Sequence, residues 1–180
     1  MDNNSPISYY GGKANLAAII VPLIPPHSQY VEPFFGGGSI FWAKPKSECE
    51  VINDFDLRVI NFWQCLQTRF TELQEMVQAT LHSEYMWKKA KTVLKAGLQN
   101  NEVEFAWAFW VQTNMSFSNI LFCSFSHQND NRSSMLLHNK RINFTDKLRE
   151  RLKHVCIFNR DALNLIRIKD RPDTFMYLRS

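Results

Sequence analysis

The fold is decided by the stretch YVEPFFGGGSIFW at residues 30–42. A short aromatic and β-branched run, which favours a strand, leads into three consecutive glycines and then into an apolar segment that favours a helix. A second apolar run, from Glu50 to Asp54, follows after a short connection and ends in an acidic residue. Strand, glycine turn, helix and strand together predict a βαβ unit, whose parallel strands need a crossover segment between them.

The segments on either side extend this pattern of alternating helices and strands. Residues 16–24 place apolar side chains at helical spacing, and Pro25 and Pro26 end the helix that this spacing predicts. Near the other end, the pattern predicts a helix at 147–152, a strand at 155–158, a helix from 162 and a strand from 173. Such alternation is typical of the α/β class with a mostly parallel sheet.

The middle of the chain has a different character. Apolar residues at helical spacing continue from Leu57 to Val111, whereas residues 113–143 are rich in Asn, Ser, His and Gln, which predicts loops or a small hairpin. We therefore expect a helical and loop-rich insertion within the sheet domain. The expected boundaries are 1–60 for the first part of the sheet domain, 61–145 for the insertion and 146–180 for the return to the sheet.

Bulk composition narrows the class of protein. With 45% hydrophobic and 21% charged residues in 180, the chain has the balance of a folded globular protein. It has no apolar run near the roughly 20 residues that a membrane helix needs, and its start does not resemble a signal peptide. We expect a cytoplasmic protein. The four cysteines and five histidines show no ligand-like spacing, so we expect reduced thiols and no metal site.

The net charge of +4 is only mildly basic, but its distribution is uneven. Basic residues concentrate in the last quarter of the chain, where they could neutralise phosphates of a nucleic acid. Asp146, Glu150 and Asp170 lie among them, as expected for the solvated face of a helix. Charge alone leaves both interpretations open.

The glycine turn and the second strand carry the first chemical signal. Gly36, Gly37 and Gly38 would let the backbone approach a cofactor at the end of the first strand. Asp54 ends the second strand, where a carboxylate can accept hydrogen bonds from ribose hydroxyls. Sites for NAD, FAD and S-adenosylmethionine all use this arrangement, although Phe41 stands where a dinucleotide fingerprint has its third glycine. A plain strand-to-helix turn is the alternative.

Several motifs together resemble the D12 class, or Dam-like, DNA adenine-N6 methyltransferases. They occur in that family's order and approximate spacing, and they are YGGK at residues 10–13, VEPFFGGGS at 31–39, IND at 52–54, NRDA at 159–162 and PDTFMYL at 172–178. The resemblance implies a Rossmann-like methyltransferase sheet, of which this chain holds the N-terminal part, with an inserted DNA-recognition subdomain. It also implies S-adenosyl-L-methionine as cofactor, double-stranded DNA as substrate and methyl transfer to N6 of adenine.

The resemblance assigns roles to single residues. Tyr10, Gly11, Gly12 and Lys13 would contact the methionine end of the cofactor, and Asp54 would hold the ribose hydroxyls. The residues that would wrap the methionine and ribose are Glu32, Pro33, Phe34, Gly36, Gly37 and Gly38. Asp161, with Ala162 beside it, would hold the adenine amino group. The candidate DNA contacts, within about 114–141, are Asn119, Asn131, Arg132, Lys140 and Arg141.

Each of these residues also has a plain structural interpretation. Phe34 and Phe35 could be ordinary core aromatics. Asp161 is placed to cap the following helix. Lys13 and the Asn and Arg residues of a polar loop could simply be solvated. The functional interpretation rests on their joint occurrence.

The sequence departs from the family at the catalytic motif. After Leu178 the family has Asp-Pro-Pro-Tyr, whereas this sequence has Arg179 and Ser180. An arginine has no acceptor lone pair for the adenine amino group, so we predict no catalytic residue in this chain. We expect the polypeptide to be inactive alone, or to act with a second polypeptide that supplies the missing half.

Two other classes of function stay open at this stage. One is a noncatalytic DNA- or cofactor-binding remnant of the same fold. The other is a fragment of a nucleotide-binding oxidoreductase, against which the three adjacent glycines and the Tyr-Gly-Gly-Lys segment both count.

Overall fold

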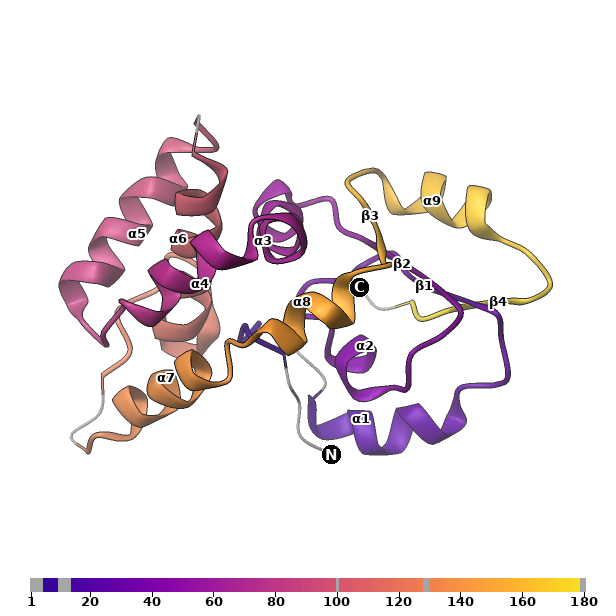
Figure 1. The fold of residues 1–180 in the computed structure, drawn as a ribbon, viewed down its shortest axis with the longest axis horizontal. Coiled ribbons are helices and arrows are strands. Elements are labelled where there is room, and N and C mark those ends of the chain that lie inside the picture. Colours follow the sequence, from indigo (N-terminus) through magenta and orange to yellow (C-terminus); the bar gives the residue numbers. More distant parts are fainter. Residues whose placement is uncertain (1–4, 10–13, 100, 128–129, 179–180) are drawn as a thin grey trace. The chain divides into compact units, whose positions relative to one another are not determined.

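The computed structural model describes residues 5–9, 14–99, 101–127 and 130–178 (Figure 1). The chain divides into two compact units. Unit 1 consists of the described residues within Met1–Ser5, Gly11–Ile60 and Lys153–Ser180, and unit 2 of those within Pro6–Tyr10 and Asn61–Leu152. The sheet lies in unit 1, and unit 2 is helical.

Unit 1 is built on a four-stranded parallel sheet in the order β3-β2-β1-β4. The strands are β1 (Gln29–Glu32), β2 (Cys49–Asn53), β3 (Cys156–Phe158) and β4 (Thr174–Met176). All three pairings are parallel: Val31 lies opposite Val51 and Met176, and Ile52 lies opposite Ile157. The predicted α/β class with a parallel, Rossmann-like sheet is confirmed. Because the strands run in one direction, their carboxyl ends meet at one edge of the sheet and their amino ends at the other.

Helices cover both faces of this sheet (Figure 1). Val31 and Val51 form a buried cluster with Leu165 of α9 (Ala162–Lys169), so α9 packs on one face. Side chains alternate between faces along a strand, so Tyr30 and Glu50 point to the other face. On that side lie α1 (Ala14–Ile20), the short η1 (Val21–Leu23) and α2 (Ser39–Ala43), with α1 packed on α2.

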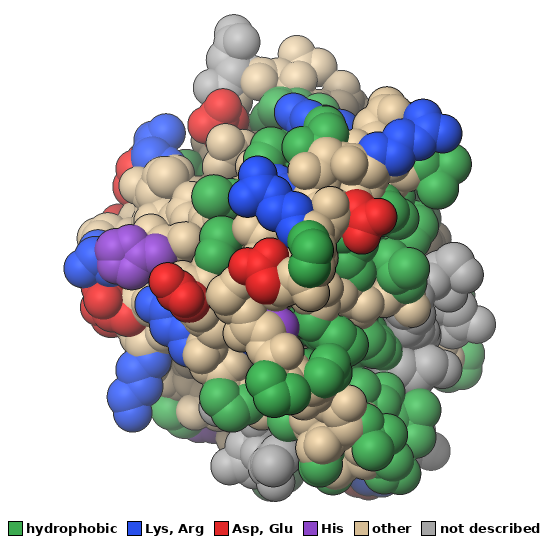
Figure 2. Space-filling view, turned by 90° about the vertical axis from the view of Figure 1, so that its right-hand side faces the viewer, with side chains coloured by type: hydrophobic (Ala, Val, Ile, Leu, Met, Phe, Trp, Pro, Cys, Tyr) green, Lys and Arg blue, Asp and Glu red, His purple; other side chains and the backbone are tan. Residues whose placement is uncertain are grey.

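The helix predicted at residues 16–24 is present as α1 and η1, but its apolar stripe is not the buried side. Ala17 is buried, whereas Ile19 and Leu23 are 62% and 75% exposed. The small alanine lets α1 lie close to its neighbour, and the larger side chains remain at the surface. Figure 2 shows hydrophobic side chains at the surface of the face it draws, with lysines, arginines and acidic residues scattered between them.

Unit 2 is organised around α6 (Glu102–Met115), which contacts α4 (Phe70–Gln78), α5 (Glu84–Ala96) and α7 (Arg132–Ile142). Almost every residue of α6 from Phe105 to Thr113 is buried, as expected of a helix surrounded by others. Two tryptophan side chains connect these helices to neighbouring segments by hydrogen bonds. The indole N–H of Trp107 donates to Thr80 Oγ1 at 2.7 Å, and that of Trp87 donates to Ser116 Oγ at 3.0 Å. Helices α3 (Leu57–Thr68) and α8 (Asp146–Leu152) precede and follow this group in the chain, and the boundary between the units falls within α3.

The prediction of loops across residues 113–143 is partly wrong. A short η2 (Phe117–Asn119) and a bridge between Ser116 and Phe125 follow α6, but residues 132–142 form the helix α7. Leu137 is the one residue that α7 buries, so the helix has no apolar stripe that sequence periodicity could detect. Its content of Ser, Asn and His is what made the segment look like a loop.

In the described part of the chain, no helix is long and apolar enough to cross a membrane.

Candidate functional site

The glycine turn after β1 has a conformation that requires glycine. Gly36 and Gly38 have φ angles of 49° and 63°, in the left-handed region that side chains disfavour. The amide of Gly38 donates to the carbonyl of Phe35 at 2.8 Å, which closes the turn. A Cβ atom on Gly38 would lie 2.4 Å from the Phe35 ring, and the carbonyl of Gly37 accepts from Ser5 Oγ at 2.8 Å. Phe35 and Ser5 therefore hold the turn in place at the carboxyl edge of the sheet.

Asp54 joins the glycine turn to the end of β2. One carboxylate oxygen accepts from the amide of Gly36 at 2.8 Å, and the other accepts from the amide of Asp56 at 2.9 Å. Burial raises the pKa of Asp54, while the backbone amides of Asp56, Gly36 and Phe55 act in the opposite direction. A carboxylate has about four acceptor positions, so two amide donors leave capacity for a ligand's hydroxyl groups.

Asn53, for which no role was predicted from the sequence, connects the ends of three strands. Its side-chain amide is fully buried and donates to the carbonyls of Pro33 at 2.9 Å and of Arg160 at 3.0 Å. Its oxygen accepts from the amide of Arg160 at 3.0 Å. Asn53 thus fixes the loops that follow β1 and β3 relative to β2. An asparagine at the end of a buried strand, directly before the acid, was the available signal.

Asn159 makes a second tie at the same edge and supports an exposed aromatic ring. Its side chain donates to the carbonyls of Asp54 at 2.8 Å and of Phe55 at 3.2 Å, which connects the loop after β3 to the loop after β2. Phe55 is 81% exposed, an unusual state for a phenylalanine that directly follows a core strand. No role was predicted for Phe55 from the sequence, although its position directly after Asp54 was an available signal.

The two phenylalanines before the glycines differ. Phe35 is buried and meets the ring of Phe41 edge-on at 5.4 Å, so the core interpretation holds for it. Phe34 is 42% exposed at the edge of the sheet. Glu32 lies deeper than expected for a ligand contact: its side chain is buried and accepts from the Tyr30 hydroxyl at 2.9 Å. Burial and the neighbouring Glu32 raise the pKa of Tyr30 far above its usual value.

Asp161 acts as the N-cap of α9. Its Oδ1 atom accepts from the amide of Asn164 at 3.0 Å, which satisfies one of the free donors at the start of the helix. The side chain is exposed, and Ala162 begins the helix beside it. Asp161 therefore caps the helix as its position in the sequence predicted. It lies at the same carboxyl edge of the sheet as Asp54.

The structure brings most of the predicted cofactor residues to one edge of the sheet. Pro33, Phe34 and the glycines follow β1, Asp54 follows β2, and Asp161 and Ala162 follow β3. Tyr10, Gly11, Gly12 and Lys13 lie outside the described residues. Within the described ranges, no group of three or more His, Cys, Asp or Glu residues could hold a metal ion.

The predicted DNA contacts lie in unit 2 and differ in accessibility. Asn131 and Arg132 are exposed at the start of α7, and Asn119 lies in η2 with a positive φ of 58°. At the other end of α7, Arg141 donates through its guanidinium group to the carbonyl of Gln78. Burial lowers the pKa of Lys140 to about 8. The start of α7 is thus freer to meet a ligand than its end.

One comparison with known proteins bears on this arrangement. A protein-family model described as D12 class N6 adenine-specific DNA methyltransferase matches residues 9–178. The match covers strands, glycine turn and helical insertion alike, and it confirms the resemblance found in the sequence. Members of this family are enzymes that generally use S-adenosylmethionine as methyl donor.

Proposed function

The chain belongs to the D12 class of N6 adenine-specific DNA methyltransferases, and from this premise we propose that the carboxyl edge of β1, β2 and β3 binds S-adenosyl-L-methionine. The observation that carries the proposal is the hydrogen bond from the Gly36 amide to the Asp54 carboxylate at 2.8 Å. This hydrogen bond links the glycine turn after β1 to Asp54, the acid that would accept hydrogen bonds from the ribose hydroxyls. Open sheets of this kind bind ligands at the carboxyl ends of their strands.

The side chains at this edge fit the cofactor's chemistry. Asp54 is an acceptor for ribose hydroxyls, and the positive φ angles of Gly36 and Gly38 give the turn beside it a conformation that residues with side chains rarely adopt. Asp161 is an acceptor for the adenine amino group through the capacity that its capping hydrogen bond leaves. Glu32 and Pro33 are buried where the chain enters the turn, whereas Phe34 is exposed at the surface. In this proposal Tyr10 to Lys13 keep the role that the family resemblance gives them.

Phe55 adds a surface for the adenine ring. Its ring is exposed directly after Asp54, and its carbonyl is tied to Asn159, two residues before Asp161. An exposed aromatic face between the acid for the ribose and the acid for the adenine amino group suits a stacked purine. We assign it that role.

We further propose that unit 2 contacts double-stranded DNA through the start of α7. Arg132 and Asn131 are exposed there, and arginine binds phosphate oxygens and base edges. Lys140 and Arg141 contribute less, because the first is partly buried and the second is held by Gln78.

The bound cofactor supplies an electrophilic methyl group on a sulfonium. The residues of this chain would hold the cofactor's ribose and adenine at Asp54, Phe55 and Asp161 and place DNA against unit 2. The 180 residues contain no Asp-Pro-Pro-Tyr to accept from the adenine amino group. We therefore propose that these 180 residues bind cofactor and DNA without transferring a methyl group, because transfer needs an acceptor segment that lies outside them.

A tritium-transfer assay tests the catalytic part of this proposal. The polypeptide is incubated with S-adenosylmethionine labelled in its methyl group and with plasmid DNA, and cofactor retention is measured in the same samples. We expect labelled cofactor to be retained without incorporation into DNA. Incorporation into adenine would contradict inactivity, whereas absence of both would contradict cofactor binding.

Fluorescence anisotropy with a labelled duplex tests the DNA surface. Arg132→Ala should weaken binding and reduce the salt dependence by about one charge, as expected for one lost phosphate contact. Arg149→Ala is the matched control, because Arg149 in α8 is already paired with Asp146 at 2.8 Å. Equal effects of the two substitutions would argue against a contact at α7.

A further inference from the structure

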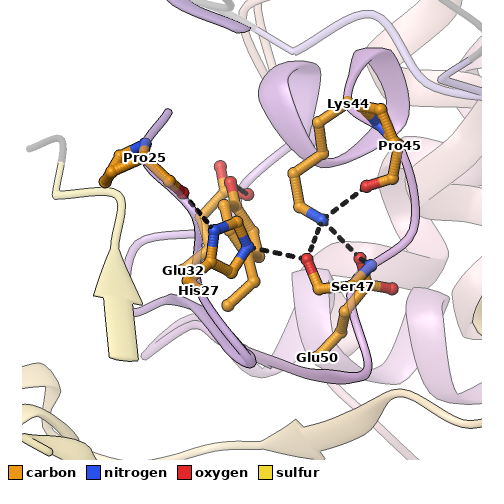
Figure 3. Close-up of polar contacts among 8 residues, drawn as sticks. Pro25, His27, Glu32, Lys44, Pro45, Ser47 and Glu50 are labelled. Atoms are coloured by element: carbon orange, nitrogen blue, oxygen red, sulfur yellow. Dashed lines mark hydrogen bonds and ion pairs between the residues drawn. The ribbon is translucent and has the colours of Figure 1, made fainter. Parts of the chain in front are cut away.

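An open pocket of about 480 Å³ lies at the amino ends of β1 and β2. Its lining residues fall in 21–27 and 44–48, immediately before the two strands, so it lies at the opposite edge of the sheet from the proposed cofactor site. The apolar part of the lining consists of Val21, Ile24, Pro25, Pro26 and Pro45. The polar part consists of His27, Lys44, Lys46, Ser47 and Glu48, of which His27, Ser47 and Lys44 are joined by hydrogen bonds (Figure 3).

The hydrogen bonds of His27 fix the direction of the proton on Ser47. His27 Nδ1 lies 2.7 Å from the carbonyl oxygen of Pro25, and Nε2 lies 2.8 Å from Ser47 Oγ. A carbonyl oxygen can only accept, so Nδ1 carries the hydrogen. In the neutral ring Nε2 is then an acceptor, and the Ser47 hydroxyl donates to it. This is the arrangement of a nucleophile, a base and a group that orients the base.

A fixed cation lies on the same hydroxyl oxygen. Lys44 Nζ donates to Ser47 Oγ at 2.7 Å, to the carbonyl of Pro45 at 2.8 Å and to Glu50 Oε1 at 2.6 Å. The Lys44 and Glu50 side chains are each only 2% exposed, so solvent does not screen the ammonium group. Glu50 balances the charge of this ammonium group, and the N–H that Lys44 donates to Ser47 Oγ would stabilise negative charge that develops on that oxygen.

We propose that Ser47 is a nucleophile that accepts acyl groups from activated esters of short apolar acids. Ser47 Oγ attacks the ester carbonyl carbon while its proton passes to His27 Nε2. The bond from that carbon to the leaving oxygen breaks, and the leaving oxygen takes the proton from His27. Water then attacks the acyl carbon as its proton passes to His27 Nε2, the acyl–Oγ bond breaks, and Ser47 Oγ takes the proton back as the carboxylic acid leaves. The proline- and isoleucine-lined wall holds the acyl chain.

A purely structural network makes a different prediction. The chain from Pro25 through His27 and Ser47 also ties the segment before β1 to the segment before β2. That tie needs hydrogen-bonding groups but no proton acceptor that can become charged. A glutamine at position 27 can make hydrogen bonds but cannot take up the serine proton. His27→Gln therefore distinguishes a general base at position 27 from a residue that only links the two segments by hydrogen bonds.

The test is labelling of the full chain with a fluorophosphonate that carries a short alkyl group, located by intact mass and peptide mapping. Oγ displaces fluoride from phosphorus and its proton passes to His27. We expect a single adduct on Ser47, which should not form when the protein is unfolded in urea before the reagent is added. His27→Gln should slow labelling by about 100-fold or more, the usual contribution of a general base, with little change in melting temperature.

Ser28 is the internal control. It directly follows His27, but its hydroxyl donates to the Asp173 carboxylate and has no imidazole partner. Labelling of Ser47 no faster than Ser28 in the folded chain would overturn the proposal, as would labelling of His27→Gln at the unsubstituted rate. The comparison of the two serines decides the matter even if the variant does not fold. Neither result depends on cofactor or DNA binding.

Discussion

Asp54 is subject to two opposing influences, and their balance predicts how cofactor binding depends on pH. Burial raises the pKa of this carboxyl group and the amides of Asp56 and Gly36 lower it, with a net increase. Only the ionised form accepts hydrogen bonds from both ribose hydroxyls. Affinity for S-adenosylmethionine should therefore fall on acidification at a pH above the value of about 4 that is usual for aspartate. Calorimetric titrations between pH 4 and 8 measure this, and an affinity unchanged until pH 4 would contradict it.

The exposed ring of Phe55 predicts a loss of affinity without a loss of stability. Stacking of a base on an aromatic side chain is worth about 1–3 kcal/mol, so Phe55→Ala should weaken cofactor binding roughly 5- to 150-fold. Little stability should be lost, because the ring is 81% exposed. Tyr85→Ala is the matched control, since Tyr85 is 74% exposed on α5. If both variants bind the cofactor as the unsubstituted chain does, Phe55 has no stacking role.

The loss of stability caused by a substitution at Gly38 should depend on the neighbouring Phe35 ring. An alanine there would have an unfavourable φ and a Cβ 2.4 Å from the Phe35 ring, so Gly38→Ala should lower the free energy of unfolding by about 1–3 kcal/mol. The loss should be smaller when Phe35 is already replaced by leucine, because the ring is then absent. Urea denaturation of the two single variants and the double variant gives this coupling. Equal losses in both backgrounds would show that the ring is not the cause.

At the residue scale, the sequence predicted the residues whose type is itself the signal. Gly36 to Gly38 and Asp54 were found because a glycine turn and an acid at a strand end can be recognised from residue type and spacing. Asn53 and Phe55 were missed, because a buried asparagine and an exposed phenylalanine are recognised only by burial and contacts. The cofactor roles assigned to all of these residues stay predictions.

At the scale of elements, Asn53 connects three strand ends through one side chain. Asn53→Ala would leave the Pro33 carbonyl and both backbone groups of Arg160 without this partner, and a buried group left unpaired costs about 1–3 kcal/mol. We expect a loss of unfolding free energy of at least that size, together with weaker cofactor binding. Asn159→Ala, at an exposed position, should cost less. A ranking in the opposite order in urea denaturation would contradict the role given to Asn53.

Elements with a clear hydrophobic pattern could be predicted, and others could not. The strands at 49–53 and 156–158 are short apolar runs, and both were expected close to where they lie. Helix α7 was missed because Leu137 alone is buried, so packing and not periodicity defines it. Helix α1 was expected, but its buried side is set by Ala17, which a hydrophobic scale ranks below Ile19.

At the scale of the whole molecule, the alternation of strands and helices fixed the class of fold, because parallel strands require crossover helices. The order of strands and the division into two units come from contacts between distant parts of the chain, which no local pattern encodes. The matched family accounts for the type of reaction. Binding of the cofactor at the carboxyl edge of the sheet is the central claim, and it depends on unit 1 alone.

Calorimetric titration of the chain with S-adenosylmethionine, beside the variants Asp54→Ala and Asp146→Ala, tests that claim most directly. We predict one saturable site that Asp54→Ala weakens by about tenfold or more, since a hydrogen bond to a charged group is worth about 1.5–3 kcal/mol. Asp146→Ala, which removes an exposed carboxylate from α8, should leave the affinity unchanged. A folded chain that shows no binding, or an Asp54→Ala variant that binds as tightly as the unsubstituted chain, would contradict it.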